Sequence, residues 1–157
     1  KYPMINARFD GNKITALKDI NIGVAVDTEK GLMVPVIHNA NKKDVLDISG
    51  ELRQKAASAG SGQIKSNDIN NGTFTISNLG MLGIEQFIPI INPPQCAILA
   101  VGSIEKDVVV DDMDEIRIQR RFWLSLVFDH RIIDGAPAGK FLRDLKRILE
   151  WPLLLAE

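Results

Sequence analysis

The segment Phe128-Asp129-His130-Arg131-Ile132-Ile133-Asp134-Gly135 holds the residues best suited to chemistry. His130 is a candidate general base, because imidazole exchanges protons close to working pH. Asp129 and Arg131 flank it with opposite charges. Asp134 follows four residues after His130, where a carboxylate at a helix start can cap free amides and meet the positive end of the dipole. The spacing therefore indicates an acid–base site.

Each of these residues also has a structural interpretation. A lone histidine between a strand and a helix is often structural, and Asp134 could be only a helix cap. Asp129 and Arg131 could form a local ion pair. The chain has no Gly-x-Ser-x-Gly nucleophile elbow. By residue type and spacing alone, the segment is a candidate acid–base site and no more.

A buried strand and an amphipathic helix must position this segment. Residues 121–128 form a nearly continuous apolar run, which is typical of a strand covered on both faces. Beyond Asp134, apolar residues at intervals of three and four predict a helix that ends near Trp151, because Pro152 follows. The buried stripe of that helix is Ala138, Phe141, Leu142, Leu145, Ile148 and Leu149.

Strand patterns occupy most of the chain before that segment. Pro35 cannot donate a ladder hydrogen bond, so its strand should be an edge or irregular there. In the strand at 73–77, Ser77 shares a face with Thr73 and Thr75, and Phe74 and Ile76 take the other face. Strands are expected at 5–9, 13–16, 20–27, 32–37, 73–77, 96–101 and 108–110, and from 116 onward.

A second helix is expected after Asn41, a plausible N-cap, with Gly60 as its C-cap. Its apolar stripe is Val45, Ile48, Leu52, Ala56 and Ala59. Residues 61–71 read as a loop with one helical turn. Strands mixed with two helices predict an α/β (α+β) two-layer sandwich, a mixed sheet with helices packed on it.

Composition narrows the function classes. The 157 residues are 45% apolar and 25% charged, as in a globular domain, and 19 basic minus 20 acidic residues give a net charge of −1. A general electrostatic grip on nucleic acid or on an anionic membrane is not indicated. Cys96 is the single cysteine, so an internal disulfide is excluded. One cysteine and two histidines also exclude a Cys/His zinc cage within one chain.

Five segments in a fixed order resemble a known family. They are Tyr2-Pro3-Met4-Ile5-Asn6-Ala7, residues 21–28 with 31–37, residues 72–80, residues 91–102, and the Asp-His-Arg-x-x-Asp-Gly box at 129–135. Together they resemble the catalytic domain of the dihydrolipoamide acyltransferases of 2-oxo acid dehydrogenase complexes. The resemblance runs from Tyr2 almost to the end of the chain.

The resemblance implies the fold of chloramphenicol acetyltransferase and the transfer of an acyl group between the thiols of dihydrolipoamide and coenzyme A. His130 matches the base that takes the proton from the attacking thiol. Ser77 matches the hydroxyl that stabilises the tetrahedral oxyanion, and Asp134 matches an acid that supports the site's geometry. Coenzyme A is then a substrate, the lipoyl group is carried on a separate domain, and no metal is implied.

The resemblance also implies an assembly. The family forms homo-trimers that join into cubic or dodecahedral cores, with the histidine of a site from one subunit and the serine from its neighbour. The decarboxylase and dihydrolipoamide dehydrogenase components are the expected partners, and no nucleic acid or membrane is expected. The expected compartment is the cytoplasm, or the mitochondrial matrix in a eukaryote.

The family's catalytic domain is longer than this chain. We therefore expect residues 1–157 to be the C-terminal part of a single acyltransferase domain, without the lipoyl and subunit-binding domains. The missing leading part would carry an arginine that pairs with the acid matching Asp134.

Several alternatives remain open at this point. The segments 78–84 and 91–95 favour an acetyl group, with branched-chain acyl and succinyl groups as alternatives. A non-catalytic core-forming scaffold and another acyltransferase of the same superfamily are further readings. Asn92 is a weak cofactor-binding candidate. His38 reads as a surface residue and Cys96 as a small buried one, and Lys42-Lys43 and Arg120-Arg121 read as solvated charge.

Overall fold

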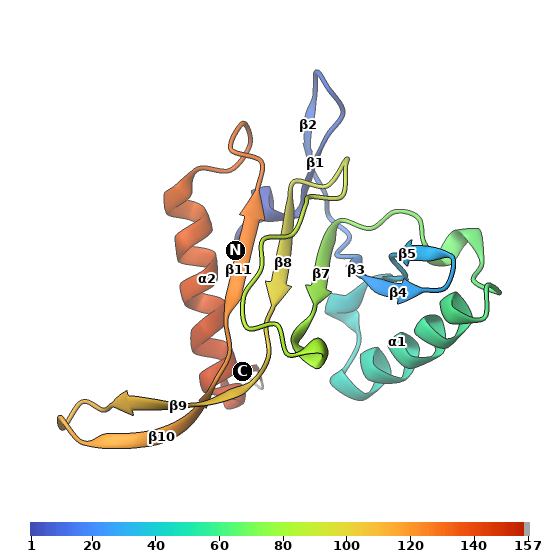
Figure 1. The fold of residues 1–157 in the computed structure, drawn as a ribbon. Helices are drawn as coiled ribbons and strands as arrows, with labels where there is room; N and C mark the ends of the chain where they lie inside the picture. Colours follow the sequence, from blue (N-terminus) through green and yellow to red (C-terminus); the bar gives the residue numbers. More distant parts are fainter. Residues whose placement is uncertain (156–157) are drawn as a thin grey trace.

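A five-stranded mixed sheet organises residues 1–155, the part of the chain that the computed structural model describes (Figure 1). The strand order is β11-β8-β7-β3-β6. The three central strands run parallel, and the two edge strands run antiparallel to their neighbours. The strands are β3 (Ile22–Val24), β6 (Val36–Ile37), β7 (Phe74–Asn78), β8 (Ala97–Val101) and β11 (Leu124–Phe128).

Three antiparallel hairpins extend from this sheet. The hairpin of β9 and β10 projects away from the rest of the molecule as a two-stranded arm (Figure 1). The six hairpin strands are β1 (Ala7–Phe9), β2 (Ile14–Ala16), β4 (Val26–Thr28), β5 (Gly31–Met33), β9 (Glu105–Val110) and β10 (Ile116–Arg121).

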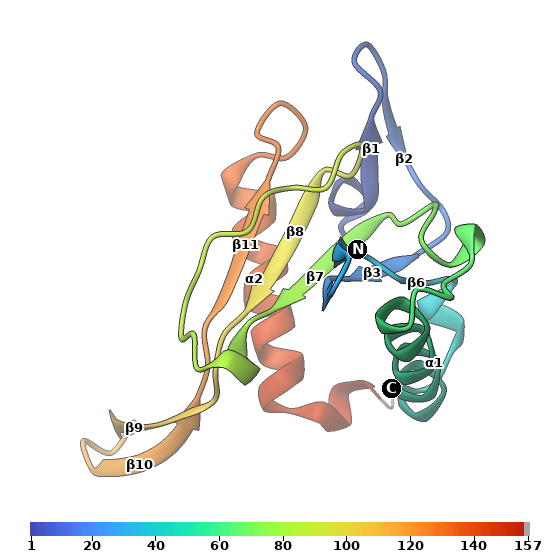
Figure 2. The same cartoon turned by 45° about the vertical axis from the view of Figure 1, so that its right-hand side comes forward.

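Two helices complete the fold, as the sequence predicts. α2 (Gly135–Glu150) packs along β11, and α1 (Val45–Gly60) contacts β4 and β6 near the other edge (Figures 1 and 2). Within the described residues, no helix is both long and apolar enough to cross a membrane. Short 3-10 turns occupy Pro3–Asn6, Ala40–Lys42, Ser66–Asp68, Gly80–Leu82 and Pro152–Leu155. The mixed sheet and its two helices confirm the predicted sandwich.

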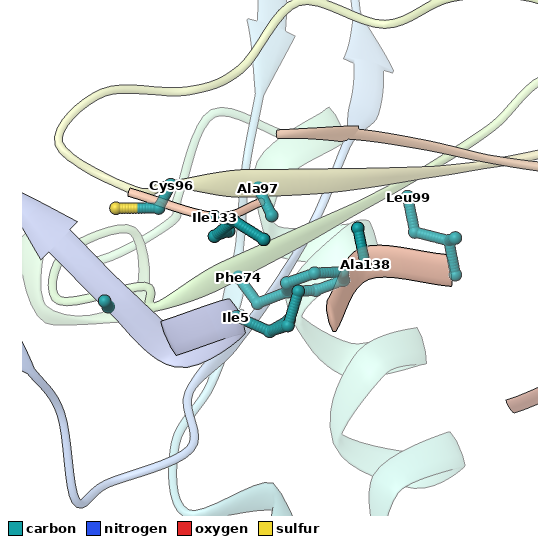
Figure 3. Packing of buried hydrophobic residues seen from close by; sticks show 8 residues of the cluster. Ile5, Phe74, Cys96, Ala97, Leu99, Ile133 and Ala138 are labelled. Carbon is teal, nitrogen blue, oxygen red and sulfur yellow. The ribbon is translucent and has the colours of Figure 1, made fainter. Parts of the chain in front are cut away.

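The core lies between one face of the sheet and α2. Phe74, Ala97 and Leu99 point from β7 and β8 toward Ile133 and Ala138 around the start of α2 (Figure 3). Ala97 is fully buried because small side chains let the helix approach the sheet closely. The alternation predicted for 73–77 is therefore confirmed on its apolar side.

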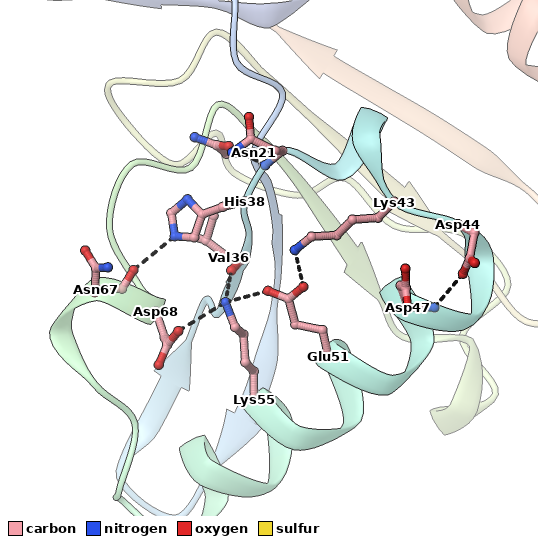
Figure 4. Close-up of polar contacts among 11 residues, drawn as sticks. Asn21, Val36, His38, Lys43, Asp44, Asp47, Glu51, Lys55, Asn67 and Asp68 are labelled. Carbon is pink, nitrogen blue, oxygen red and sulfur yellow. Dashed lines mark hydrogen bonds and ion pairs between the residues drawn. The ribbon is translucent and has the colours of Figure 1, made fainter.

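Polar contacts hold α1 on the sheet edge (Figure 4). The Lys55 ammonium donates to the carbonyl of Val36 at 2.5 Å and pairs with Glu51 at 2.9 Å and Asp68 at 3.1 Å. Burial acts to lower the pKa of Lys55, but the two carboxylates outweigh it and raise the pKa. This cluster anchors the helix to β6, and its role is structural.

The start of α1 differs from the prediction. Asn41 lies in the 3-10 turn Ala40–Lys42 and is not the N-cap. Asp44 caps the helix instead, because its Oδ1 accepts the amide of Asp47 at 2.7 Å. At the other end, Gly60 is the last helical residue and Ser61 is the C-cap.

Four predicted strands differ from the expectation, because two begin later and two are divided. Residues 3–6 form a 3-10 turn, so the first strand begins at Ala7. The strand at 20–27 divides at Ala25, and its second half leaves the sheet to pair with β5. Pro35 separates β5 from β6, and β6 is an edge strand, which confirms the expectation at that proline. The last strand begins only at Leu124.

Candidate active site

His130 lies in the tight turn that joins β11 to α2. The Asp129 amide donates to the carbonyl of Cys96 at 2.9 Å, and the Asp129 carbonyl accepts the amides of Ile132 and Ile133 at 3.0 Å each. These bonds tie the main chain on both sides of His130 to the buried part of the sheet. The imidazole is exposed, and its ring centre lies 5.7 Å from that of Phe128. The turn thus presents an exposed imidazole on a rigid support.

Asp129 and Arg131 form the predicted local ion pair. The Arg131 Nε donates to Asp129 Oδ1 at 2.9 Å, and its Nη2 donates to Oδ2 at 2.6 Å. This two-pronged pairing lowers the pKa of the Asp129 carboxyl and raises that of the Arg131 guanidinium. The pair therefore stays charged throughout the working pH range.

Asp134 occupies the N-cap position of α2, as predicted, but its side chain makes no capping hydrogen bond. Only its carbonyl joins the helix, accepting the amide of Ala138 at 3.2 Å. The expectation that its carboxylate caps the amides is wrong, and within residues 1–155 this exposed carboxylate has no hydrogen-bond partner. Its negative charge still lies at the positive end of the helix dipole.

Ser77 is the fourth residue of β7 and is half-buried. It is paired in register with Ala100 of β8, and Ala100 is in turn paired with Ser125 of β11. Ser77 therefore shares the sheet face with Thr75, opposite α2. Among the described residues no protein hydrogen bond engages its hydroxyl, which leaves it available to a ligand.

One chain does not bring Ser77 and His130 together. Ser77 lies level with Ala100, whereas Phe128 is paired with Ala97, and His130 follows beyond that end of β11. With about 3.3 Å per residue and about 4.8 Å between strands, Ser77 and Phe128 are already roughly 14 Å apart. Within one chain, the predicted site residues Ser77 and His130 thus lie in two separate places.

Two glycines bring the chain close together just after Ser77. A Cβ on Gly80 would lie 2.5 Å from the carbonyl oxygen of Gly102, and one on Gly102 would lie 1.8 Å from the carbonyl oxygen of Glu85. The Ser103 amide donates to the carbonyl of Ile84 at 2.9 Å. These contacts fix the segment that follows the serine.

A second anchor fixes the far end of that segment. The Thr75 hydroxyl donates to Gln95 Oε1 at 2.7 Å, and both side chains are buried. Sequence reasoning did not single out Gln95, although it lies inside the Ile91–Gly102 segment that resembles the family. A buried threonine on the polar face of a strand could have indicated such a partner.

A cavity of about 1040 Å³ lies between the base of the β9–β10 hairpin and α2. Ser103 lines it, and the Ser103 Oγ is buried without a hydrogen-bond partner among residues 1–155. Phe122 and Trp123 add aromatic surface. Its charged lining comprises five basic residues, Lys106, Arg120, Arg121, Arg143 and Lys146, and four acidic ones, Glu85, Glu105, Asp107 and Glu150. The charges of this lining nearly balance, and two of its basic residues already pair with its acids, Arg121 with Asp107 and Lys146 with Glu150.

The structure also gives the surroundings of four other residues that the sequence brings up. Asn92 is exposed in a turn, where its carbonyl accepts the amide of Gln95 at 3.1 Å. His38 is half-buried at the surface, and its Nε2 lies 3.0 Å from the carbonyl oxygen of Asn67 (Figure 4). Cys96 is fully buried, and burial raises the pKa of its thiol to about 11. Arg121 is paired with Asp107 at 2.8 Å at the cavity.

Comparison with known protein families shows which family the chain belongs to. The model of the 2-oxoacid dehydrogenases acyltransferase catalytic domain matches residues 1–157. The chain belongs to this family. The box that carries His130 and the strand that carries Ser77 are therefore parts of an acyltransferase domain.

Curated relatives of this acyltransferase domain come from two kinds of complex. The chain is 44% identical over 97% of its length to the acetyltransferase component 2 of the mitochondrial pyruvate dehydrogenase complex of Arabidopsis thaliana. It is 43% identical over 96% of its length to the lipoamide acyltransferase component of the branched-chain alpha-keto acid dehydrogenase complex of Bacillus subtilis. It spans only 29% and 35% of the length of these relatives.

Solved structures of the family share its fold. The structure of the dihydrolipoamide acetyltransferase of Azotobacter vinelandii is 34% identical in sequence and superposes with a TM-score of 0.94. The match covers 99% of this chain and 65% of the Azotobacter chain. The cubic core of a pyruvate dehydrogenase multienzyme complex is 36% identical in sequence, with a TM-score of 0.90. That match covers 94% of this chain and 61% of the core's chain. A chloramphenicol acetyltransferase, 14% identical with a TM-score of 0.54, shares the fold alone.

Proposed function

We propose that this chain is the C-terminal part of the catalytic domain of a dihydrolipoamide acyltransferase, which moves an acetyl group between the thiols of dihydrolipoamide and coenzyme A. The observation that carries the proposal is the rigid turn that presents His130 as an exposed base within a chain that matches the family along its whole length. The half-buried Ser77 supplies the second group that the reaction needs.

In the proposed reaction, His130 accepts the proton of the attacking thiol. The ordinary thiol pKa is about 8.5, so a nearby neutral imidazole increases the reactive thiolate. The thiolate sulfur bonds to the thioester carbonyl carbon, and the carbonyl π electrons move to oxygen. Ser77 donates a hydrogen bond to that oxyanion. When the carbonyl re-forms, the carbon–sulfur bond to the leaving thiolate breaks, and protonated His130 returns the proton to it.

Ser77 and His130 are proposed to act across a subunit boundary, with each supplied by a different copy of the chain. Their separation within one chain supports this arrangement. The solved relative that is a cubic core supports an assembly built from several copies, with trimers as the proposed unit.

The β9–β10 arm also favours association. Val108 faces Ile118 across the hairpin and Val110 faces Ile116, so the four apolar side chains share one face, 63% to 75% exposed. A two-stranded hairpin is marginally stable in water by itself, and an exposed apolar face of this kind marks a contact surface. We assign that surface to a neighbouring copy of the chain.

An investigation of the Azotobacter vinelandii enzyme supports the choice of site residues. That work concerns a serine, a histidine and an asparagine in the catalytic mechanism, and the asparagine follows the histidine by four residues. Asp134 follows His130 by the same interval. Because an amide serves in the relative, we propose that Asp134 supports the geometry without exchanging a proton. An arginine from the leading part of the domain is its proposed partner.

Coenzyme A is proposed to bind at the cavity beside Ser103, with its phosphates on Arg120 and Arg143. The lipoyl group would arrive on a separate domain, from the decarboxylase reaction, and would leave toward the dihydrolipoamide dehydrogenase component. The proposed compartment is the cytoplasm or the mitochondrial matrix.

The acetyl assignment rests on the segments 78–84 and 91–95, because relatives from pyruvate and branched-chain complexes are almost equally similar. Acetyl-, isobutyryl- and succinyl-coenzyme A offered together in one transfer assay separate these alternatives. Preference for the branched or the succinyl group would overturn the acetyl assignment and leave the acyltransferase assignment in place.

The experiment that tests the function is thiol-to-thiol transfer by the full-length oligomeric protein and its His130→Ala variant. Loss of the general base is expected to lower kcat by roughly 10²–10⁴-fold. Unchanged transfer in the variant would favour the second candidate, a core-forming scaffold without catalysis. The intact pair of Ser77 and His130 favours the enzyme.

A further inference from the structure

The turn that carries His130 is closed by the side chains on either side of it. Asp129 Oδ1 accepts both the main-chain amide of Arg131 at 3.0 Å and its Nε at 2.9 Å. The carboxylate therefore bridges over His130 from the residue before it to the residue after it. Since the same carboxylate also binds Nη2 at 2.6 Å, the bridge is held at three points.

The Arg131 guanidinium has a second contact from a distant part of the chain. Its central carbon lies 4.3 Å from the ring centre of Phe9, within the range of a cation–π interaction. Phe9 ends β1, and its amide donates to the carbonyl of Pro94 at 2.9 Å. The guanidinium is thus clamped between a carboxylate on the turn and an aromatic ring fixed on another strand.

The exposure of the two partners argues against a merely stabilising ion pair. The Asp129 side chain is 17% exposed, whereas the Arg131 side chain is 69% exposed. Exposed pairs contribute little stability in general, but an arginine fork on a carboxylate defines geometry well. His130 lies between the two members of this pair in the sequence.

We propose that Asp129, Arg131 and Phe9 are positioning residues for His130. The inference rests on the proposed role of His130 as the base. Within residues 1–155 the imidazole has no hydrogen-bond partner, so its direction depends on the main chain and on the Phe128 ring. The clamp sets that main chain and thereby the direction of the imidazole toward the thiol.

The test measures transfer kinetics in the full-length oligomeric protein. Arg131→Ala is expected to lower kcat by roughly 10–100-fold, because a misplaced base loses alignment with the thiol, and to leave KM for coenzyme A unchanged. Arg131→Lys keeps the charge without the fork and recovers part of the loss. Phe9→Tyr keeps the ring and the activity, whereas Phe9→Leu lowers kcat by a smaller factor than Arg131→Ala.

The decisive comparison repeats Arg131→Ala in a His130→Ala background. A positioning residue acts through His130, so the second substitution is expected to cause no further loss of kcat. Arg8→Ala is the matched control, because Arg8 pairs with Asp10 on the same hairpin as Phe9 but does not contact the turn. It should leave kcat unchanged.

Two results would overturn the inference. One is an equal loss from Arg131→Ala with and without His130, which would indicate a structural effect. The other is full activity of Arg131→Ala while His130→Ala is impaired. Unimpaired activity of His130→Ala would instead overturn the proposed function itself, so the two failures are distinguishable.

Discussion

Ser77 and His130 lie at opposite ends of the same sheet. Ser77 is in register with Ala100 near the end of β8, whereas His130 follows Phe128, which is paired with Ala97 at the start of β8. They are also two strands apart, because β8 runs between β7 and β11. The proposed reaction needs both groups at one thioester, so the two are proposed to come from different copies of the chain.

This separation predicts complementation between inactive variants. Ser77→Ala is expected to lower kcat by roughly 10²–10³-fold through loss of the oxyanion donor. Co-expression of Ser77→Ala chains with His130→Ala chains should restore transfer far above either parent, since a mixed oligomer contains sites with an intact serine and an intact histidine from different copies.

The control for complementation is the double variant Ser77→Ala/His130→Ala co-expressed with either single variant. Such mixtures hold no intact pair and should stay inactive. If hetero-oligomers that demonstrably contain both single variants also stay inactive, the proposal that two copies of the chain share one site is wrong.

Alanine substitution at two glycine positions should change the stability of the fold in opposite directions. Gly102→Ala would place a Cβ 1.8 Å from the carbonyl oxygen of Glu85, and this overpacking should destabilise the fold by about 1–3 kcal/mol. Gly50 lies inside α1 with no atom near its Cβ position, so Gly50→Ala should stabilise by about 0.5–1 kcal/mol. Urea unfolding of both variants provides the measurement, and a stable Gly102→Ala protein would contradict the close approach.

Removal of the buried side-chain amide of Asn21 should lower the free energy of unfolding. Its Nδ2 donates to the carbonyl of Asn71 at 2.8 Å, and its Oδ1 accepts the amide of Asn39 at 2.9 Å. Asn21→Ala leaves both main-chain groups without this partner and should cost about 1–3 kcal/mol in urea unfolding. Asn12→Ala, in the exposed turn of the β1–β2 hairpin, is the control and should change stability by less than about 0.5 kcal/mol.

The buried thiol of Cys96 should make the free energy of unfolding depend on pH in alkaline solution. Burial, aided by the charge of Asp129, raises the pKa of its thiol from 9.0 to about 11. Above pH 9 the unfolded chain releases this proton and the folded chain keeps it, so the free energy of unfolding falls as pH rises toward 11. Below pH 9 both states hold the proton, and the contribution of Cys96 is constant.

The measurement for Cys96 is denaturant unfolding at a series of pH values. Cys96→Ala should show a shallower fall in stability between pH 9 and 11 than the parent chain, whatever its stability at neutral pH. Labelling with a thiol reagent should be slow in the folded protein and fast in denaturant. Rapid labelling of the folded chain would contradict the burial.

Much of the fold follows from local periodicity. The alternation at Phe74 and Ile76 reflects a strand with one apolar face, and the spacing in 138–149 reflects one helical face, since side-chain direction repeats every two or 3.6 residues. Helix caps and strand ends follow less directly. Asn41 and Asp44 are both capable of capping, and only the 3-10 turn at 40–42 decides between them.

The sequence by itself determined the family and predicted the residue types of the proposed site. The box at 129–135 and the strand at 73–77 are contiguous, so their residues can be read in order. The ion pair of Asp129 and Arg131 was also predictable, because its members are two residues apart.

Only the tertiary structure decided which of these groups meet. The contact of Arg131 with Phe9 and the bond of Thr75 to Gln95 join segments that are far apart in the sequence. The separation of Ser77 from His130 depends on strand order and register. Packing of the whole sheet sets these relationships, because strand pairing is a long-range choice that no local pattern encodes.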